Sequence, residues 1–149
     1  VAALRGPYIL MSVKSTLRDM MISWSREIQM LRDLGQKDII LDPGFGFGKT
    51  LEQNYEIYNG MEQLAALRLP LLVGVSRKSM IFKLIGGDSM TALNGTTVLH
   101  TAALLKGASI LRVHDVREAV EAVQIVSAIQ SASPFEKPEA AVQNSSFHI

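Results

Sequence analysis

The chain has 149 residues, of which 48% are hydrophobic and 19% are charged. This size and composition are typical of one globular domain and not of a disordered or fibrous protein. Its 15 basic and 14 acidic residues give a formal charge of +1, which argues against a general nucleic-acid surface, for which a clustered basic face is expected. The absence of cysteine excludes disulfides, thiolate nucleophiles and sulfur-rich metal sites.

Hydropathy predicts no membrane span. The longest strongly apolar run, around Leu69 to Val75, is far shorter than the roughly 20 residues that a membrane helix needs. The N-terminus has no signal-peptide pattern, and a chain without cysteine is compatible with a reducing cytosol. We therefore expect a cytoplasmic protein with no membrane or nucleic-acid partner, whose ligands are small molecules or proteins.

Short apolar runs alternate with amphipathic helical stretches along the chain. The runs that predict strands are Tyr8–Met11, Ile39–Leu41, Leu71–Val75 and Ile110–Val113. The stretches that predict helices are Met20–Leu34, a stripe through Ile57, Met61, Leu64 and Leu67, then Ala92–Lys106 and Arg117–Ile129. Gly35 and Gly107 follow two of these helices as C-terminal caps. Continuously apolar strands separated by helices are typical of a parallel sheet.

Four βα units predict an α/β fold, either an open doubly wound sheet or a portion of a (β/α)8 TIM barrel, whose typical length is about 250 residues. Polar side chains at the strand ends favour the barrel. Asp42 follows the second strand, residues 76–79 follow the third, and residues 112–115 follow the fourth. Barrel enzymes place their sites at this face, often with a phosphate between the last two βα loops. We predict a partial barrel in residues 1–130 and a mobile tail in residues 131–149, where Ser and Pro replace the apolar pattern.

The segment from Ile39 to Thr50 is an apolar run that ends in an aspartate, a proline and alternating glycines. Its spacing excludes a phosphate-binding P-loop, whose first glycine would fall at Pro43, and a dinucleotide fingerprint, whose third glycine comes one residue early. Pro43 biases Asp42 toward an extended backbone. Asp42 can accept hydrogen bonds from two neighbouring N–H groups of a heterocycle such as a pterin or guanine. The alternative role for this side chain is a turn cap.

The strand ends also carry cationic groups. Lys78 can donate to a ring carbonyl or nitrogen while its charge holds an anion, or it is a solvated loop lysine. Arg112 and His114 are two residues apart, so in a regular strand they point to the same side. An arginine fork beside an imidazole suits a diphosphate group. The alternative is a salt bridge to Asp115 or Glu118.

Aromatic residues flank the same glycine segment. Phe45 and Phe47 are separated by one glycine and are not easily buried together in one tight loop, so we expect one in the core and the other as a wall for an aromatic substrate. No serine nucleophile is indicated, because Ser76 and Ser79 have no sequence cue that links them to a base. Metal-ligand spacing is absent as well.

Three segments of the chain resemble the dihydropteroate synthase family and occur in that family's order. They are Leu41–Lys49, Leu71–Ser79 and Leu111–Val116. The resemblance covers about Val1 to Gln130 and corresponds to the C-terminal half of the family's barrel. It implies a folate-pathway transferase that joins p-aminobenzoate to 6-hydroxymethyl-7,8-dihydropterin diphosphate and releases pyrophosphate, with Mg2+ on the diphosphate.

The resemblance also implies roles for particular residues. Asp42 would bind the amino-pyrimidine edge of the pterin, and Lys78 would donate to its ring. Arg112 and His114 would bind the diphosphate, so that their charge and that of Lys78 favour departure of the leaving group. The p-aminobenzoate pocket, where sulfonamides are expected to compete, would be lined by Phe47 and Ser79. None of these residues is implied as a metal ligand.

The chain also departs from the family pattern. The family's N-terminal half has no counterpart here, and with it an asparagine that binds magnesium and diphosphate, a second pterin-binding aspartate and a mobile loop near p-aminobenzoate. Where the family has Met-His-Met-Gln-Gly, this chain has Met11 to Thr16 with a different sequence. Because an unclosed parallel sheet leaves its edge strands exposed, we expect self-association, most simply as a homodimer, or dependence on a missing segment.

Two other functions remain as alternatives. One is a non-catalytic half-barrel that binds pterin or diphosphate, or serves as an assembly module. The other is the pterin-binding domain of a corrinoid-linked methyltransferase, which resembles the same fold family. Its substrate has no diphosphate, so the pairing of residues 76–79 with residues 112–114 favours the synthase.

Overall fold

The computed structural model describes residues 6–132, in which four parallel strands alternate with helices. The strands are β1 (Tyr8–Met11), β2 (Ile39–Asp42), β3 (Leu72–Val73) and β4 (Ile110–Leu111). The α-helices are α1 (Leu17–Asp33), α2 (Leu51–Asn59), α3 (Ser79–Ile85), α4 (Leu93–Leu105) and α5 (Val116–Ser131). Two 3-10 helices are η2 (Met61–Leu67) and η3 (Ser89–Thr91). Most of the predicted tail, residues 133–149, lies outside the described residues.

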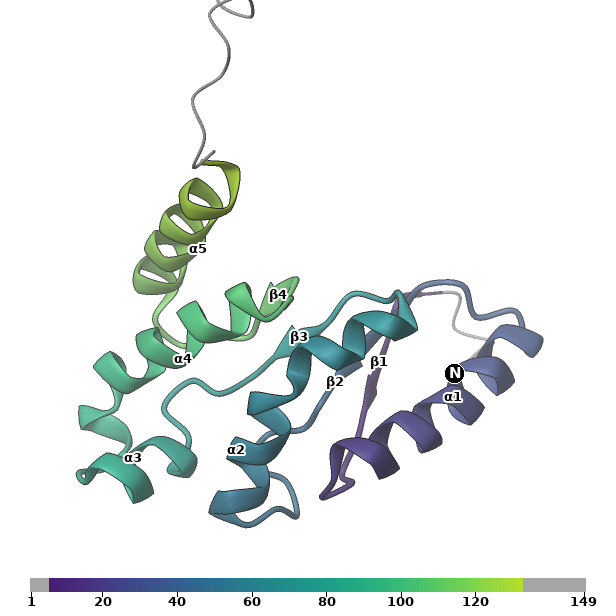
Figure 1. Cartoon of the computed structure of the whole chain (residues 1–149), viewed down its shortest axis with the longest axis horizontal. Helices are drawn as coiled ribbons and strands as arrows, with labels where there is room; N and C mark the ends of the chain where they lie inside the picture. Colours follow the sequence, from purple (N-terminus) through teal and green to yellow (C-terminus); the bar gives the residue numbers. More distant parts are fainter. Residues whose placement is uncertain (1–5, 133–149) are drawn as a thin grey trace, which may run out of the picture.

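The strands form one run of parallel neighbours in chain order. β1 pairs with β2, with Met11 opposite Asp42, and β3 pairs with β4. A parallel bridge between Leu41 and Leu71 joins the two pairs. In Figure 1 the helices follow the strands in the same order, from α1 beside β1 to α4 and α5 at the other end. The prediction of four βα units is confirmed, and β1 and β4 are the edge strands of the described sheet.

Local sequence signals set the ends of the first helix. The hydroxyl of Thr16 caps the N-terminus of α1, which satisfies a backbone N–H that has no partner within the helix. At the other end Gly35 has φ of +87°, and the N–H of Gln36 donates to the carbonyl of Leu31. This is the Schellman arrangement that glycine favours, so the prediction that Gly35 ends this helix is confirmed.

The prediction of one helical stripe through residues 57–67 is wrong in detail. Helix α2 ends at Asn59, Gly60 follows as its cap, and η2 continues as a 3-10 helix. A Cβ on Gly60 would lie 2.8 Å from a methyl group of Leu17, so α1 packs closely at this break. The short helices α3 and η3 were not predicted, because fewer than two turns carry too little periodicity to recognise.

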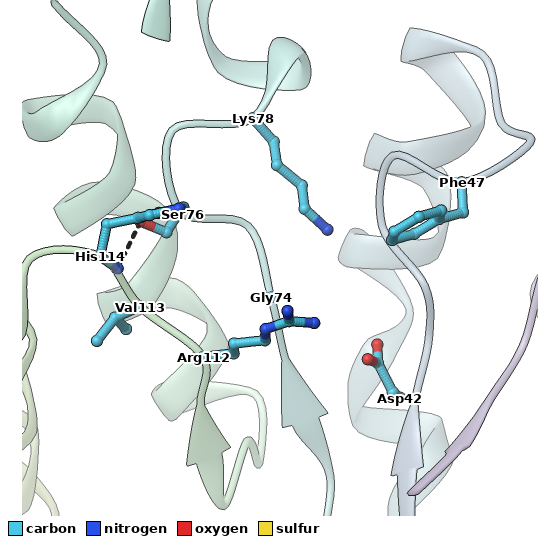
Figure 2. Close-up of a pocket in the computed structure, with 8 residues that line it drawn as sticks. All are labelled: Asp42, Phe47, Gly74, Ser76, Lys78, Arg112, Val113 and His114. Atoms are coloured by element: carbon cyan, nitrogen blue, oxygen red, sulfur yellow. Dashed lines mark hydrogen bonds between the residues drawn. The ribbon is translucent and has the colours of Figure 1, made fainter. Parts of the chain in front are cut away.

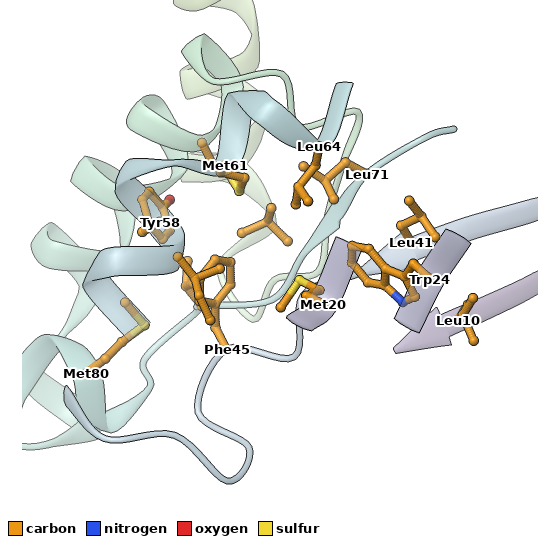
Figure 3. Packing of buried hydrophobic residues seen from close by; sticks show 14 of the residues in the cluster. Leu10, Met20, Trp24, Leu41, Phe45, Tyr58, Met61, Leu64, Leu71 and Met80 are labelled. Carbon is orange, nitrogen blue, oxygen red and sulfur yellow. The ribbon is translucent and has the colours of Figure 1, made fainter. Parts of the chain in front are cut away.

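The hydrophobic core lies between the sheet and the helices. Among its most buried members are Met20, Trp24, Leu41, Phe45, Ile57, Met61, Leu64, Val73 and Met80, most of which are labelled in Figure 3. The rings of Phe45 and Tyr58 pack with centroids 5.0 Å apart, a favourable tilted geometry. The core therefore anchors the loop after β2 as well as the helices.

The opposite face of the sheet is less covered. On β1, Leu10 is buried, whereas its neighbours Ile9 and Met11 are 48% and 40% exposed. In a full (β/α)8 barrel, side chains from other strands fill this interior face. Within residues 6–132 the face of β1 that carries Ile9 and Met11 is therefore left partly exposed. No helix in this range is both long and apolar enough to cross a membrane.

Candidate functional site

A cavity of about 200 Å³ lies at the carboxyl ends of β2, β3 and β4 (Figure 2). It is lined by Asp42, Phe47, Gly74, Ser76, Lys78, Arg112, Val113 and His114. Five of the six predicted site residues are therefore brought together. The sixth, Ser79, is the first residue of α3 and does not line this cavity, so its role stays a prediction.

Asp42 forms the turn cap that its sequence context suggested, and its ligand-binding role stays a prediction. Its Oδ1 accepts a hydrogen bond of 2.8 Å from the backbone N–H of Gly44, which is a turn cap. Among the described residues no donor reaches Oδ2, and the carboxylate points into the cavity toward Lys78 and Arg112 (Figure 2). One oxygen thus shapes the loop, while the other is available to a ligand.

The glycine loop after β2 is held by close backbone packing and by the side chain of Lys49. Gly44 has φ of +67°, and a Cβ there would lie 2.2 Å from the carbonyl oxygen of Ser12, so a larger residue does not fit. The Nζ of Lys49 donates to the carbonyls of Gly44 at 2.9 Å and Phe47 at 3.1 Å. Burial lowers the pKa of Lys49, and the nearby Asp42 opposes that shift. This loop-holding role of Lys49 was not predicted from the sequence. A lysine that follows a glycine run without P-loop spacing could have indicated it.

The two phenylalanines of this loop divide as expected. Phe45 is completely buried in the core, whereas Phe47 is 48% exposed and lines the cavity. The prediction of one core ring is confirmed, and the role of Phe47 as a wall for a substrate stays a prediction. An exposed aromatic ring at a cavity edge can stack on a flat substrate.

Lys78 reaches across the cavity from the loop after β3. Its Nζ donates to the carbonyl of Phe45 at 2.7 Å and lies 4.8 Å from the centroid of the Phe47 ring, within the range of a cation–π contact. Burial lowers the pKa of Lys78, Asp42 raises it, and Arg112 lowers it further. Lys78 is therefore part of the cavity wall and not a solvated loop lysine.

Arg112 and His114 both face the cavity (Figure 2). Although β4 ends at Leu111, the N–H of Arg112 donates to the carbonyl of Val73 at 3.0 Å and continues the extended pairing. The three ion pairs within residues 6–132 include neither Arg112 nor His114. The predicted alternative, a salt bridge from these residues to Asp115 or Glu118, is therefore not formed in the described structure.

His114 is instead held by a residue of the neighbouring loop. The Oγ of Ser76 lies 2.9 Å from Nδ1 of His114 and accepts a hydrogen bond of 3.2 Å from its backbone N–H. Ser76 is 5% exposed, so this contact is sheltered. Sequence reasoning linked Ser76 to no base. The contact is not part of a Ser-His-Asp triad, because the adjacent Asp115 is bonded to Arg77.

The lining residues do not by themselves fit a magnesium site. Asp42 is the one carboxylate among them, and it shares the cavity with Lys78 and Arg112. Magnesium prefers several oxygen ligands in octahedral geometry. Within residues 6–132 no group of three or more His, Asp or Glu side chains is placed to hold a metal. The arrangement suits a flat ring with one hydrogen-bonding edge and an attached anion.

Comparison with known proteins agrees with this chemistry. The family described as "Pterin binding enzyme" matches residues 10–114, a range that includes every residue lining the cavity. The dihydropteroate synthase of Escherichia coli (strain K12) is 44% identical over 99 residues, which are 66% of this chain and 35% of that protein. The chain thus spans about a third of the length of this curated relative.

Solved structures share the fold. Yersinia pestis DHPS with a pterine-sulfa conjugate superposes with a TM-score of 0.84 at 37% identity, over 89% of this chain and 55% of that chain. Xanthomonas albilineans dihydropteroate synthase with 4-aminobenzoic acid gives a TM-score of 0.84 at 31% identity, over 89% and 52% of the two chains. The prediction of a partial (β/α)8 barrel is confirmed.

Proposed function

The chain belongs to the family of pterin-binding enzymes, and we propose on that premise that it forms the C-terminal half of a dihydropteroate synthase. The observation that carries the proposal is one cavity that gathers Asp42, Phe47, Lys78, Arg112 and His114 from three strand ends. These groups supply a carboxylate for an amino-pyrimidine edge, an aromatic wall and cations for a diphosphate. The similarity to dihydropteroate synthases supports the same reaction.

In this proposal the loops after β2, β3 and β4 bind different parts of the substrate. The carboxylate of Asp42 accepts two N–H groups of the pterin, and the ammonium of Lys78 donates to its ring. Phe47 lines the side where p-aminobenzoate enters, together with Ser79. Arg112 and His114 hold the diphosphate, and both lie on the segment after β4.

In this reaction negative charge develops on the leaving group, close to the cationic side chains of the loops after β3 and β4. The amine nitrogen of p-aminobenzoate forms a bond to the pterin methylene carbon, while the bond from that carbon to the diphosphate oxygen breaks. Pyrophosphate leaves with the electron pair, and the amine releases its proton to solvent. Because negative charge accumulates on the leaving oxygen, Arg112, His114 and Lys78 stabilise the transition state more than the ground state.

The rest of the proposed enzyme lies outside these residues. Magnesium in this proposal is carried by the diphosphate and by a residue that the chain lacks. The exposed interior side chains of β1 require a second set of strands, which we propose comes from the missing half of the barrel or from association into a homodimer. We also propose a cytoplasmic location, where a folate-pathway transferase meets its substrates.

A second candidate is a half-barrel that binds without catalysis. The observation that favours it is the uncovered sheet face, on which Ile9 and Met11 remain exposed, because a water-filled site weakens electrostatic stabilisation. The methyltransferase alternative is less favoured, since its substrate has no diphosphate to match Lys78, Arg112 and His114.

The test measures turnover and binding together. The purified chain is assayed for dihydropteroate formation from p-aminobenzoate and the pterin diphosphate with magnesium, and binding of the pterin diphosphate and of the bare pterin is measured by calorimetry. Turnover supports the synthase, whereas diphosphate-dependent binding without turnover supports the binding half-barrel. Equal affinity for both ligands would favour the methyltransferase alternative, and no binding of either would contradict all three.

A further inference from the structure

Arg77 lies beside Lys78 in sequence, but it does not line the cavity. Its Nε and Nη2 donate to the two carboxylate oxygens of Asp115 at 2.8 and 2.9 Å, and Nη1 donates to the carbonyls of Ser89 at 2.8 Å and Met90 at 3.0 Å. A guanidinium has five N–H groups, and four of them are used in these bonds. Arg77 therefore binds the protein and not a ligand.

The position of Arg77 is built by the surrounding structure. Its backbone has φ of +54°, a left-handed conformation that costs about 1–2 kcal/mol for a residue with a side chain. Its N–H donates to the hydroxyl of Thr96 at 2.9 Å, and that hydroxyl donates in turn to the carbonyl of Ala92 at 2.7 Å. Thr96 is 1% exposed, so a buried group of α4 holds Arg77 in place.

Asp115, the partner of Arg77, carries a negative charge close to the cavity, where it would repel an anion. Asp115 directly follows His114, which lines the cavity. The hydrogen bonds from Arg77 lower the pKa of Asp115, so its carboxylate is charged at neutral pH. The charged and titratable groups around it are Arg77, His114 and His100, and Glu118 lies near Arg77. Without Arg77, a fixed negative charge would stand next to the residues proposed to bind the diphosphate.

We propose that Arg77 is a positioning residue that neutralises the charge of Asp115, so that the cavity keeps a positive field toward a diphosphate or pyrophosphate. This inference rests on the proposed function of Arg112 and His114 as the anion-binding pair. Arg77 acts through Asp115 and does not touch the anion. The contact of Ser76 with His114 joins the same two loops one residue away, so a link between these loops exists that does not depend on Arg77.

The experiment measures binding of inorganic pyrophosphate to the full chain by calorimetry, in wild type, Arg77→Gln, Asp115→Asn and the double variant. Arg77→Gln should weaken binding roughly three- to tenfold at low salt, because one negative charge is exposed near a multiply charged anion. Asp115→Asn should leave binding unchanged or tighten it. The double variant should return to within about twofold of wild type, and the effect of Arg77→Gln should shrink as salt is added.

The controls separate charge from folding. Arg117→Gln and Glu121→Gln make the same charge changes in an exposed pair on α5 and should alter binding less. Circular dichroism reports whether each variant folds. If Arg77→Gln does not fold, Asp115→Asn still tests the proposal, because its affinity for pyrophosphate should be equal to or higher than that of wild type. A lower affinity in Asp115→Asn would overturn the proposal.

The remaining outcomes distinguish the inference from the function on which it rests. If wild type binds pyrophosphate and Arg112→Ala weakens that binding, but the double variant stays as weak as Arg77→Gln, the role of Arg77 is structural and the inference is overturned while the function stands. If wild type does not bind pyrophosphate, or Arg112→Ala has no effect, the anion site is absent and both are overturned.

Discussion

The two sides of the cavity are held in place by different means. On the β2 side, the loop from Asp42 to Lys49 is shaped largely by its own residues: Asp42 caps the turn at Gly44, and Lys49 bonds to carbonyl groups of the loop. On the β4 side, Arg112 and His114 have no such local support, and side chains of the neighbouring β3 loop hold the segment. The proposed ring-binding edge on the β2 side is thus built largely within one loop, whereas the β4 side depends on contacts between loops.

This difference follows from what each side is proposed to bind. A flat ring needs a carboxylate at a fixed angle, which a rigid glycine turn supplies. An anion needs a positive field, which depends on every charge nearby. The first requirement is met by local geometry and the second by an arrangement of charges across two loops.

The largest effect is expected from a change that breaks the backbone of the β2 side. Gly44→Ala should lower the free energy of unfolding by about 2–4 kcal/mol, because the new Cβ meets the carbonyl of Ser12 and φ is positive. Gly35→Ala is the matched control, since Gly35 also has positive φ but open space around it. Thermal and denaturant unfolding measure both variants. Equal destabilisation would show that the contact with Ser12 does not matter.

Removing the main cation of the β4 side should give the next largest effect. Arg112→Ala should weaken binding of the pterin diphosphate roughly tenfold to a hundredfold, as for hydrogen bonds to charged groups, and should leave the bare pterin unaffected. Calorimetry with both ligands measures this. Arg117→Ala, on an exposed ion pair, is the control. A loss of equal size for both ligands would indicate a structural role for Arg112.

The ring-binding role of the β2 side is tested by Asp42→Asn. The asparagine oxygen can still accept from Gly44, so the loop is preserved while the negative charge is lost. Affinity for the bare pterin should fall by about 1–3 kcal/mol. The control is Asp38→Asn, an exposed aspartate before the opposite end of β2. Unchanged pterin affinity in Asp42→Asn would remove this residue from the site.

The smallest effect is expected from the contact between loops. Ser76→Ala removes the hydrogen bonds to His114 and should weaken pyrophosphate binding by about 1 kcal/mol. The same change should have little further effect in a His114→Ala background, because the two residues act together. Calorimetry on the four proteins gives this coupling. Additive losses would mean that Ser76 supports the loop independently of His114.

Much of the architecture could be predicted from short-range pattern. The strand Tyr8–Met11 was predicted with the bounds that the structure has, and Gly35 ends α1 where its backbone freedom is needed. Helix α2 was not separated from η2, because Ile57, Met61 and Leu64 remain on the buried side after the break. A hydrophobic stripe indicates which side chains are buried. It does not indicate whether the backbone forms an α-helix or a 3-10 helix.

The sequence alone determined that Asp42, Lys78, Arg112 and His114 would meet, because parallel strands bring their carboxyl ends to one edge and each of these residues lies at or just beyond a strand end. The tertiary structure decided how they are held. Arg77 and Asp115 are 38 residues apart, as are Ser76 and His114. Contacts over such separations depend on the distance between two loops, which no local pattern contains, and they arise only when the strands and helices have packed.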